Sequence, residues 1–240
     1  MVKQAFAPLV DLIYPPRCPL CGEGIGAQNG LCQTCWGELD FPADPACRGC
    51  QRPLAAEQVS EGALCGICLS RPPRHDGVVA GTLYTDAARK LVLSFKNGRR
   101  IGLAPMLARL ISARLPDLEG DWIAVPVPLH RGRLWYRGFN QSALLAKELA
   151  KLRGFEVIVD GLVRRKQTTK LGHLGKAARA QMLAGAIEAN ASRSKALDGA
   201  QVLLVDDVMT SGATTDACIA ALREAGARKI MIACFSRVID

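Results

Sequence analysis

The chain has 240 residues, which is long for one ordinary domain and too short for two full ones, so we expect a core domain with a small appendage. Its formal net charge of +9 is unevenly spread. Residues 1–75 hold 6 Lys and Arg against 7 Asp and Glu, whereas residues 89–179 hold 19 basic against 6 acidic side chains. We therefore expect a polyanionic partner to bind the middle of the chain.

The N-terminal segment 5–13 is apolar but is interrupted by Pro8 and Asp11. It is too short and too broken for the apolar part of a secretory signal or for a membrane span, so we predict an amphipathic first helix. The sequence thus predicts a cytoplasmic protein without stable membrane insertion. Attachment of this helix to a membrane surface is the alternative.

Eight of the ten cysteines lie between positions 18 and 68, as four pairs, or knuckles, of the form Cys-x2-Cys. In a reducing compartment a knuckle aims two thiolates at one point, and two knuckles complete the tetrahedral sulfur shell that Zn²⁺ prefers. The segment has few large apolar residues and is expected to need one or two structural zinc ions to fold. The predicted ligands are Cys18, Cys21, Cys32, Cys35, Cys47, Cys50, Cys65 and Cys68.

The sequence leaves open how the knuckles combine. Sequential pairing, with one site in 18–35 and another in 47–68, closes the shortest loops, and a crossed arrangement is the alternative. A redox-active Cys-x2-Cys is disfavoured because no βαβ pattern surrounds the knuckles. Cys218 and Cys234 stand singly in apolar segments and are predicted to be buried thiols.

From residue 77 onward, strand-like and helix-like segments alternate, after a stiff linker, Arg-Pro-Pro-Arg-His, at 71–75. We place the boundary there, between a zinc-ribbon domain at 1–75 and a larger domain at 76–240. Strands separated by helices predict an α/β fold with a parallel sheet and helices on both faces. The expected strands are 77–83, 122–126, 155–159, 201–205 and 229–234, and the expected helices are 86–98 (capped by Asp86), 101–115, 141–153, 177–183 and 214–225.

Two carboxylates follow the expected strand at 201–205, and a short loop of hydroxyl and small side chains then leads into a helix. The backbone N–H groups of such a loop, its hydroxyls and the positive end of the helix bind phosphate. The carboxylates can accept hydrogen bonds from vicinal ribose hydroxyls, so the pattern predicts binding of a phosphorylated ribose. The carboxylates are Asp206 and Asp207, and the loop residues are Thr210, Ser211, Gly212, Ala213 and Thr214.

Two other motifs share part of this pattern. Response-regulator receivers also end their first strand in Val-Asp-Asp, but most of that domain must follow the strand and only 33 residues remain here. A P-loop needs a lysine before its last Ser or Thr, where Ala213 stands. Both alternatives are therefore disfavoured.

A basic segment follows the expected strand at 122–126, and we predict that it is a loop. Ligands of parallel sheets bind beyond the carboxyl ends of the strands, where this segment and the acidic pair meet. The acidic pair and its loop resemble the phosphoribosyl pyrophosphate loop of type I phosphoribosyltransferases. The resemblance implies that the basic segment receives the pyrophosphate, whose charge guanidinium groups suit and would stabilise as it leaves. The candidates for this role are Arg131, Arg133 and Arg137.

Together with the knuckles, these motifs resemble the ComF family of competence-associated, phosphoribosyltransferase-like proteins. Arg-Gly-Phe-Asn-Gln at 137–141, Phe-Lys-Asn-Gly at 95–98 and Arg179 fit the family pattern, whereas Met182 stands where family members often have Asn. The resemblance covers residues 15–240. It implies a type I phosphoribosyltransferase fold with an N-terminal double zinc ribbon, and phosphoribosyl pyrophosphate as a ligand bound with Mg²⁺.

The resemblance also implies a cellular role, because family members are associated with single-stranded DNA during competence and DNA uptake. It suggests a partner in the uptake machinery or a helicase. Trp135, Tyr136, Phe139 and the basic cluster 164–166 are candidates for contacting DNA by stacking and charge. The alternative is an active phosphoribosyltransferase of nucleotide or nucleoside metabolism, whose acceptor base the sequence does not reveal. No general base is evident, since Thr210 stands where some purine-specific relatives carry an acid.

Overall fold

The computed structural model describes residues 14–55, 62–98, 100–166 and 185–239. The helices expected at 5–13 and 177–183 lie outside the described residues, as does Arg179.

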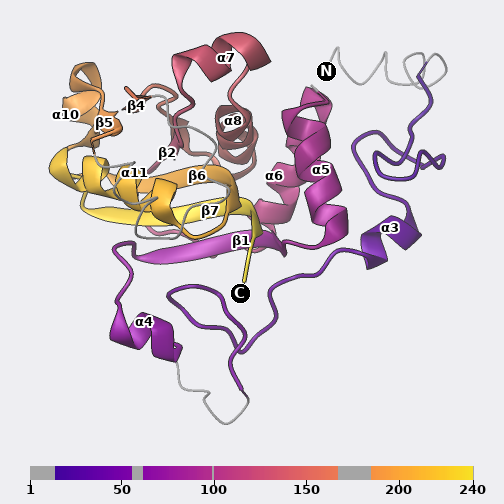
Figure 1. The fold of residues 1–240 in the computed structure, drawn as a ribbon, viewed down its shortest axis with the longest axis horizontal. Helices are drawn as coiled ribbons and strands as arrows, with labels where there is room; N and C mark the ends of the chain where they lie inside the picture. The colour runs from indigo at the N-terminus through magenta and orange to yellow at the C-terminus, as the bar shows by residue number, and fades with distance from the viewer. Residues whose placement is uncertain (1–13, 56–61, 99, 167–184, 240) are drawn as a thin grey trace.

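Five parallel strands form the centre of the larger domain, in the order β1-β7-β6-β2-β3 (Figure 1). Every neighbouring pair is parallel, so the expected α/β fold is confirmed. In the middle of the sheet, Val202 lies opposite Ile123 of β2 and Ile230 of β7. The strands are β1 (Gly77–Leu83), β2 (Trp122–Pro126), β3 (Glu156–Val157), β6 (Gln201–Met209) and β7 (Lys229–Arg237).

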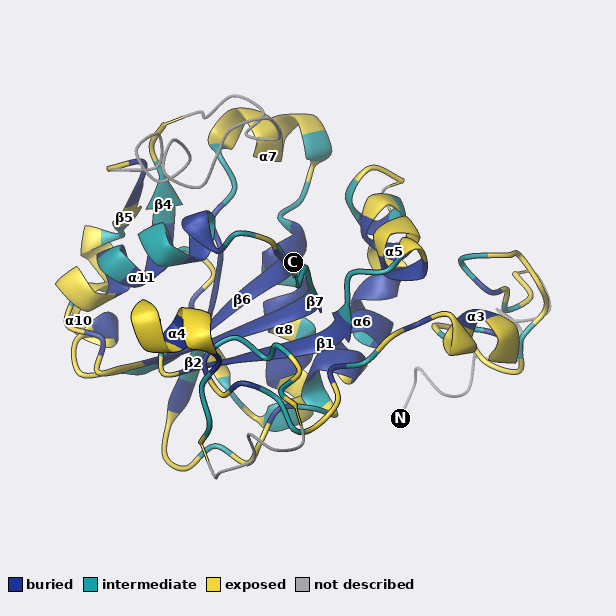
Figure 2. Ribbon diagram, turned by 60° about the horizontal axis from the view of Figure 1, so that its bottom comes forward, coloured by how far each residue is buried: buried dark blue, intermediate teal, exposed yellow. Residues whose placement is uncertain are grey.

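Helices cover both faces of the sheet, which buries its strands on both sides (Figure 2). On β6, Leu203 and Val205 face one apolar cluster while Val202 and Leu204 face the other. The first cluster includes α5 (Asp86–Lys96), α6 (Ala104–Ser112) and α8 (Gln141–Arg153). The second includes α10 (Ser194–Leu197), α11 (Ala213–Glu224) and the antiparallel pair β4 (Leu162–Arg164) and β5 (Ile187–Ala189), and the 3-10 turn η4 (Ala191–Arg193) precedes α10.

Several predicted boundaries are wrong. Thr85, not Asp86, caps α5, because its Oγ1 accepts a hydrogen bond from the N–H of Ala88 at 3.3 Å. The helix expected at 101–115 is a 3-10 turn, η2 (Ile101–Leu103), followed by the shorter α6. Strands β6 and β7 continue past their expected ends.

The basic segment after β2 is a helix, α7 (Arg131–Arg137), and not the predicted loop. Nδ1 of His130 accepts a hydrogen bond from the N–H of Gly132 at 3.2 Å, and Gly138 ends the helix at a φ of +83°. None of its residues is buried. The helix therefore lacks the apolar periodicity from which a helix is predicted in a sequence.

The first ribbon, residues 17–39 with α3 (Gln33–Gly37), docks against helices of the larger domain. Nη2 of Arg109 on α6 donates to the carbonyl of Asn29 at 2.6 Å, and Nη1 of Arg100 donates to that of Pro19 at 3.2 Å. Leu39 is buried in the cluster that α5 and α6 form. This ribbon is thus attached to the helical layer.

The second ribbon, described at residues 46–55 and 62–70 with α4 (Gly66–Ser70), docks against the sheet. Oε1 of Gln51 accepts a hydrogen bond from the N–H of Ala80 on the edge strand β1 at 2.8 Å. Nε of Arg237, at the end of β7, donates to the carbonyl of Cys50 at 2.6 Å. The ribbon therefore covers part of an edge whose backbone groups would otherwise be open.

Candidate ligand-binding and metal sites

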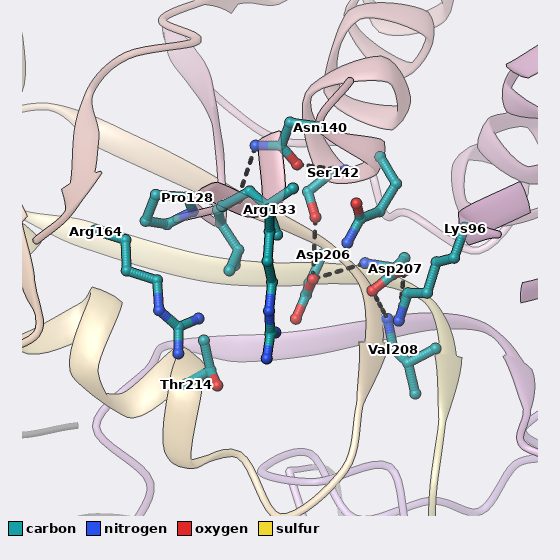
Figure 3. Close-up of a pocket in the computed structure, with 13 residues that line it drawn as sticks. Lys96, Pro128, Arg133, Asn140, Ser142, Arg164, Asp206, Asp207, Val208 and Thr214 are labelled. Atoms are coloured by element: carbon teal, nitrogen blue, oxygen red, sulfur yellow. Dashed lines mark hydrogen bonds and ion pairs between the residues drawn. The ribbon is translucent and has the colours of Figure 1, made fainter. Parts of the chain in front are cut away.

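A polar pocket lies at the carboxyl ends of β2 and β6 (Figure 3). This is the edge where parallel sheets bind their ligands. Its apolar lining comes from the segment after β2 and from Val208. Its polar and charged lining consists of Lys96, Arg133, Asn140, Gln141, Ser142, Arg164, Asp206, Asp207 and Thr214.

Asp206 and Asp207 form the buried acidic part of the pocket, at 8% and 3% exposure. Oδ1 of Asp206 accepts hydrogen bonds from the hydroxyl of Ser142 at 3.1 Å and from the N–H of Asp207 at 2.9 Å. Burial, and then the charge of Asp207, raise the pKa of Asp206 to about 7. Asp206 can therefore change its protonation state close to neutral pH.

Asp207 has a different set of partners. Its Oδ1 accepts a hydrogen bond from the N–H of Val208 at 2.9 Å, and its Oδ2 lies 2.7 Å from Nζ of Lys96. Lys96 is the last residue of α5, so this ion pair joins the first helix of the domain to the end of β6. In the sequence, Lys96 was recognised only as part of a family motif, and its contact with the acidic pair was not predicted.

Asn140 caps the N-terminus of α8 beside the acidic pair. Its Oδ1 accepts a hydrogen bond from the N–H of Ser142 at 3.0 Å, and its Nδ2 donates to the carbonyl of Val127 at 3.1 Å. This cap holds the helix against the segment after β2 and directs Ser142 toward Asp206. The residues Asn140 to Ser142 were not among the predicted site residues, although an Asn before a helix is a recognisable capping signal.

The three predicted arginines take different positions on α7. Arg133 lines the pocket, whereas Arg131 is exposed and is not among the lining residues. Nη1 of Arg137 donates to Oε1 of Gln141 at 2.6 Å. Burial lowers the pKa of Arg137, and the charge of Asp207 opposes that change. The structure thus brings Arg133 directly to the pocket, Arg137 close to it, and leaves Arg131 outside.

The basic cluster 164–166 is not one continuous charged surface. Arg164 lines the pocket, and burial, followed by the nearby charge of Arg133, lowers the pKa of its guanidinium. Nε of the next residue, Arg165, pairs with Oε2 of Glu188 at 3.0 Å, and Lys166 is exposed. Arg164 is therefore a pocket residue that the sequence had assigned to a DNA-contacting cluster.

The predicted phosphate loop leads into α11 beside the pocket. Thr214 lines the pocket, whereas residues 210–213 are not among its lining residues. Gly212 caps the helix at a φ of +80°, and Oγ1 of Thr215 donates to its carbonyl at 2.7 Å. The backbone N–H groups of the first turn have no partner inside the helix and can bind an anion.

The cysteine sulfurs form two groups, and within each group they lie within 4.8 Å of one another. Sγ of Cys32 accepts a hydrogen bond from the N–H of Cys35 at 3.5 Å, and Sγ of Cys47 accepts one from Cys65 at 3.2 Å. Four convergent sulfurs with backbone donors fit the closed tetrahedral site of a zinc ribbon. The groups follow the sequential scheme, Cys18, Cys21, Cys32 and Cys35 in one and Cys47, Cys50, Cys65 and Cys68 in the other.

Cys218 and Cys234 lie outside the two sulfur groups. Cys218 and Cys234 are fully buried, as predicted, at 0% exposure. Within the described segments from residue 14 to residue 239, no helix combines the length and the apolar character that crossing a bilayer requires.

Comparison with known protein families matches both parts of the chain. The double zinc ribbon domain matches residues 9–69, and the phosphoribosyl transferase domain matches residues 139–239. The second match includes the acidic pair, the predicted phosphate loop and the start of α8. It does not include Lys96 or Arg133, which the fold brings to the same pocket.

Several curated proteins are similar over most of their length. The DNA utilization protein YhgH of Salmonella typhimurium is 30% identical over 235 residues, which cover 95% of this chain and 100% of that protein. Competence protein F of Haemophilus influenzae is 29% identical, with 90% and 94% covered. The YhgH protein of Escherichia coli is 27% identical, with 95% and 100% covered.

Proposed function

The chain belongs to the ComF family of phosphoribosyltransferase-like proteins, and from that premise we propose that its pocket binds phosphoribosyl pyrophosphate. The observation that carries the proposal is the buried pair Asp206 and Asp207, which shares one pocket with two guanidinium groups and the start of α11. The carboxylates would accept hydrogen bonds from the ribose hydroxyls. The first turn of α11 would bind the 5′-phosphate, and Arg133 and Arg164 would bind the pyrophosphate.

Magnesium would enter this site with the ligand. Mg²⁺ commonly binds through one or two carboxylates together with substrate phosphates, and Asp206 and Asp207 would supply the oxygens. The ion would neutralise part of the pyrophosphate charge. The cationic side chains would then bind the charge that remains.

Calorimetric titration with phosphoribosyl pyrophosphate and Mg²⁺ tests this proposal. Replacing both carboxylates, Asp206→Asn with Asp207→Asn, removes two charged acceptors and should weaken binding at least about a hundredfold. Asp121→Asn, an exposed carboxylate before β2, should leave the affinity unchanged. Equal affinities of the wild type and the double variant would exclude this pocket as the ligand site.

We further propose that the protein acts in DNA utilization or competence, as the names of its relatives suggest for those proteins. In this role it would bind single-stranded DNA with α7 and work with a partner in DNA uptake or a helicase. The observation in favour is a pair of large aromatic side chains on α7, Trp135 and Tyr136, which are 89% and 80% exposed. They stand among Arg131, Arg133 and Arg137, and exposed rings flanked by cations suit unpaired bases and a phosphate backbone.

Single-strand binding can be tested separately from the pocket. Trp135→Ala and Tyr136→Ala each remove one stacking surface and should lower the affinity for an oligothymidine about tenfold or more, with little effect on phosphoribosyl pyrophosphate. Trp36→Ala serves as the control, because Trp36 is exposed on the first ribbon, away from α7. Unchanged oligothymidine affinity in both α7 variants would refute this use of the helix.

The second candidate function is phosphoribosyl transfer. Arg133 and Arg164 line the pocket together with the acidic pair, so they could stabilise pyrophosphate as its bond to C1′ breaks. A nitrogen of an acceptor base would form the new bond to C1′ and release its proton. Release of pyrophosphate with one member of a nucleobase panel, lost in the Asp206→Asn/Asp207→Asn variant, would establish the enzyme. Binding without release for every base would favour the DNA-binding role.

A further inference from the structure

Lys96 enters the pocket from α5 and contacts Asp207 (Figure 3). Its Nζ lies 2.7 Å from Oδ2 of Asp207, and the two side chains are 25% and 4% exposed. The lysine side chain, which lines the pocket, is thus partly exposed, whereas the carboxylate is shielded from solvent. A positive charge in this position faces both the acidic pair and any ligand that binds beside it.

The core fixes the backbone of Lys96, whereas its side chain is partly exposed. Leu91, Val92 and Phe95 bury the last turns of α5, and the ring of Phe95 lies 6.2 Å from that of Phe139, just before the cap of α8. The lysine stem has four carbons with rotatable bonds. Its ammonium group can therefore change partner while the helix stays in place.

A ligand that binds Asp207 meets the existing partners of this carboxylate. Oδ1 accepts the N–H of Val208 and Oδ2 pairs with Lys96, so a ribose hydroxyl that donates to Oδ2 would compete with the ammonium group. An ammonium group that gives up this carboxylate keeps its full charge and three donors, and it needs another anion nearby. In the filled pocket that anion is the pyrophosphate group.

We infer that Lys96 is a ligand-binding residue that neutralises Asp207 in the empty pocket and binds the pyrophosphate group once ribose hydroxyls occupy the carboxylates. The inference rests on the proposed function, because it concerns the same ligand. It assigns Lys96 to the pyrophosphate group and not to the ribose or the 5′-phosphate. Two ligands that differ only in that group can therefore test it.

The experiment titrates Lys96→Met with phosphoribosyl pyrophosphate and with ribose 5-phosphate, both with Mg²⁺ at pH 8.5, where Asp206 is ionised. The affinity for phosphoribosyl pyrophosphate should fall about tenfold to a hundredfold, as expected for a lost charge-assisted hydrogen bond. The affinity for ribose 5-phosphate should stay the same or rise. Lys96→Arg should recover part of the loss, and Lys90→Met, on the exposed side of the same helix, should behave as the wild type.

Any other outcome contradicts the inference, and the pattern of affinities for the two ligands shows which step is wrong. Equal losses for both ligands would mean that Lys96 only supports the shape of the pocket, and no loss for either would mean that it does not bind the ligand. Failure of the wild type to bind phosphoribosyl pyrophosphate would remove the proposed function, and this inference with it. Circular dichroism spectra and unfolding midpoints of both Lys96 variants separate these results from misfolding.

Discussion

The zinc ribbons and the ligand pocket are assembled in opposite ways. Each sulfur group comes from one short segment, 18–35 or 47–68, whereas the pocket collects side chains from α5, α7, α8, β4, β6 and α11. Spacing in the sequence is therefore enough to locate the first kind of site. The second kind exists only when the sheet brings distant segments to one edge. The two kinds of site should consequently respond to different perturbations.

The largest expected effect is the loss of a metal ligand from one ribbon. Cys65→Ser should lower the zinc content from two ions per chain to one and unfold the second ribbon, because a structural zinc contributes on the order of 10 kcal/mol to such a fold. Metal analysis of protein purified under reducing conditions measures the zinc content. Cys218→Ala, which removes a buried thiol outside the groups, should keep both ions.

The same variant tests whether the two ribbons fold independently of each other. The first sulfur group shares no residue with the second, so the remaining zinc should stay bound. Fewer than one zinc per wild-type chain would contradict the ribbon assignment. Loss of both ions from Cys65→Ser would contradict the view that each ribbon is built locally.

A smaller effect, on the order of a few kcal/mol, is expected from the buried charge in the pocket. The fold raises the pKa of Asp206 from its ordinary 3.8 to about 7. An acid whose pKa is raised by folding favours the folded state in its protonated form. Its contribution to the free energy of unfolding is therefore complete below pH 3.8 and is lost as the pH rises through 7. The wild type should therefore lose stability relative to Asp206→Asn between pH 5.5 and pH 8.5.

Urea unfolding of both proteins across this range gives the difference in their free energies of unfolding. Asp121→Asn, in which an exposed acid is replaced, should show the same pH dependence as the wild type. A constant difference between the wild type and Asp206→Asn would show that Asp206 does not ionise in this range. Ligand binding, which uses the ionised carboxylate, should strengthen over the same rise in pH.

The smallest expected effect comes from the backbone of the phosphate loop. Gly212 and Gly154 have φ angles of +80° and +76°, so an alanine at either position should cost about 1 kcal/mol of stability. Gly212→Ala should also weaken binding of ribose 5-phosphate, because it disturbs the first turn of α11. Gly154→Ala, at the end of α8, should not. Equal ligand affinities in the two variants would argue against a phosphate site at this loop.

Much of the fold was predictable because its elements carry local signals. The strands 77–83 and 122–126 and the helix 141–153 have the predicted bounds, since apolar runs and caps mark their ends. Helix α7 was missed because it buries none of its residues. Strands β4 and β5 were missed because each has only three residues, which is too few to show a period.

The site was predictable only where its functional residues lie together in one segment of the sequence. Asp206 and Asp207 were found because they follow a buried strand and precede a glycine loop. Lys96 and Arg164 could not be found in this way, because their roles depend on where α5 and β4 lie relative to β6. The same reason explains why the three arginines of α7 looked equivalent in sequence and are not equivalent in space.

The most direct test of the central claim is a crystal structure of the protein with phosphoribosyl pyrophosphate and Mg²⁺. Our account predicts the ribose hydroxyls at Asp206 and Asp207, the 5′-phosphate at the start of α11, and the pyrophosphate at Arg133, Arg164 and Lys96. A ligand bound at the zinc ribbons or on α7, with the pocket empty, would contradict it.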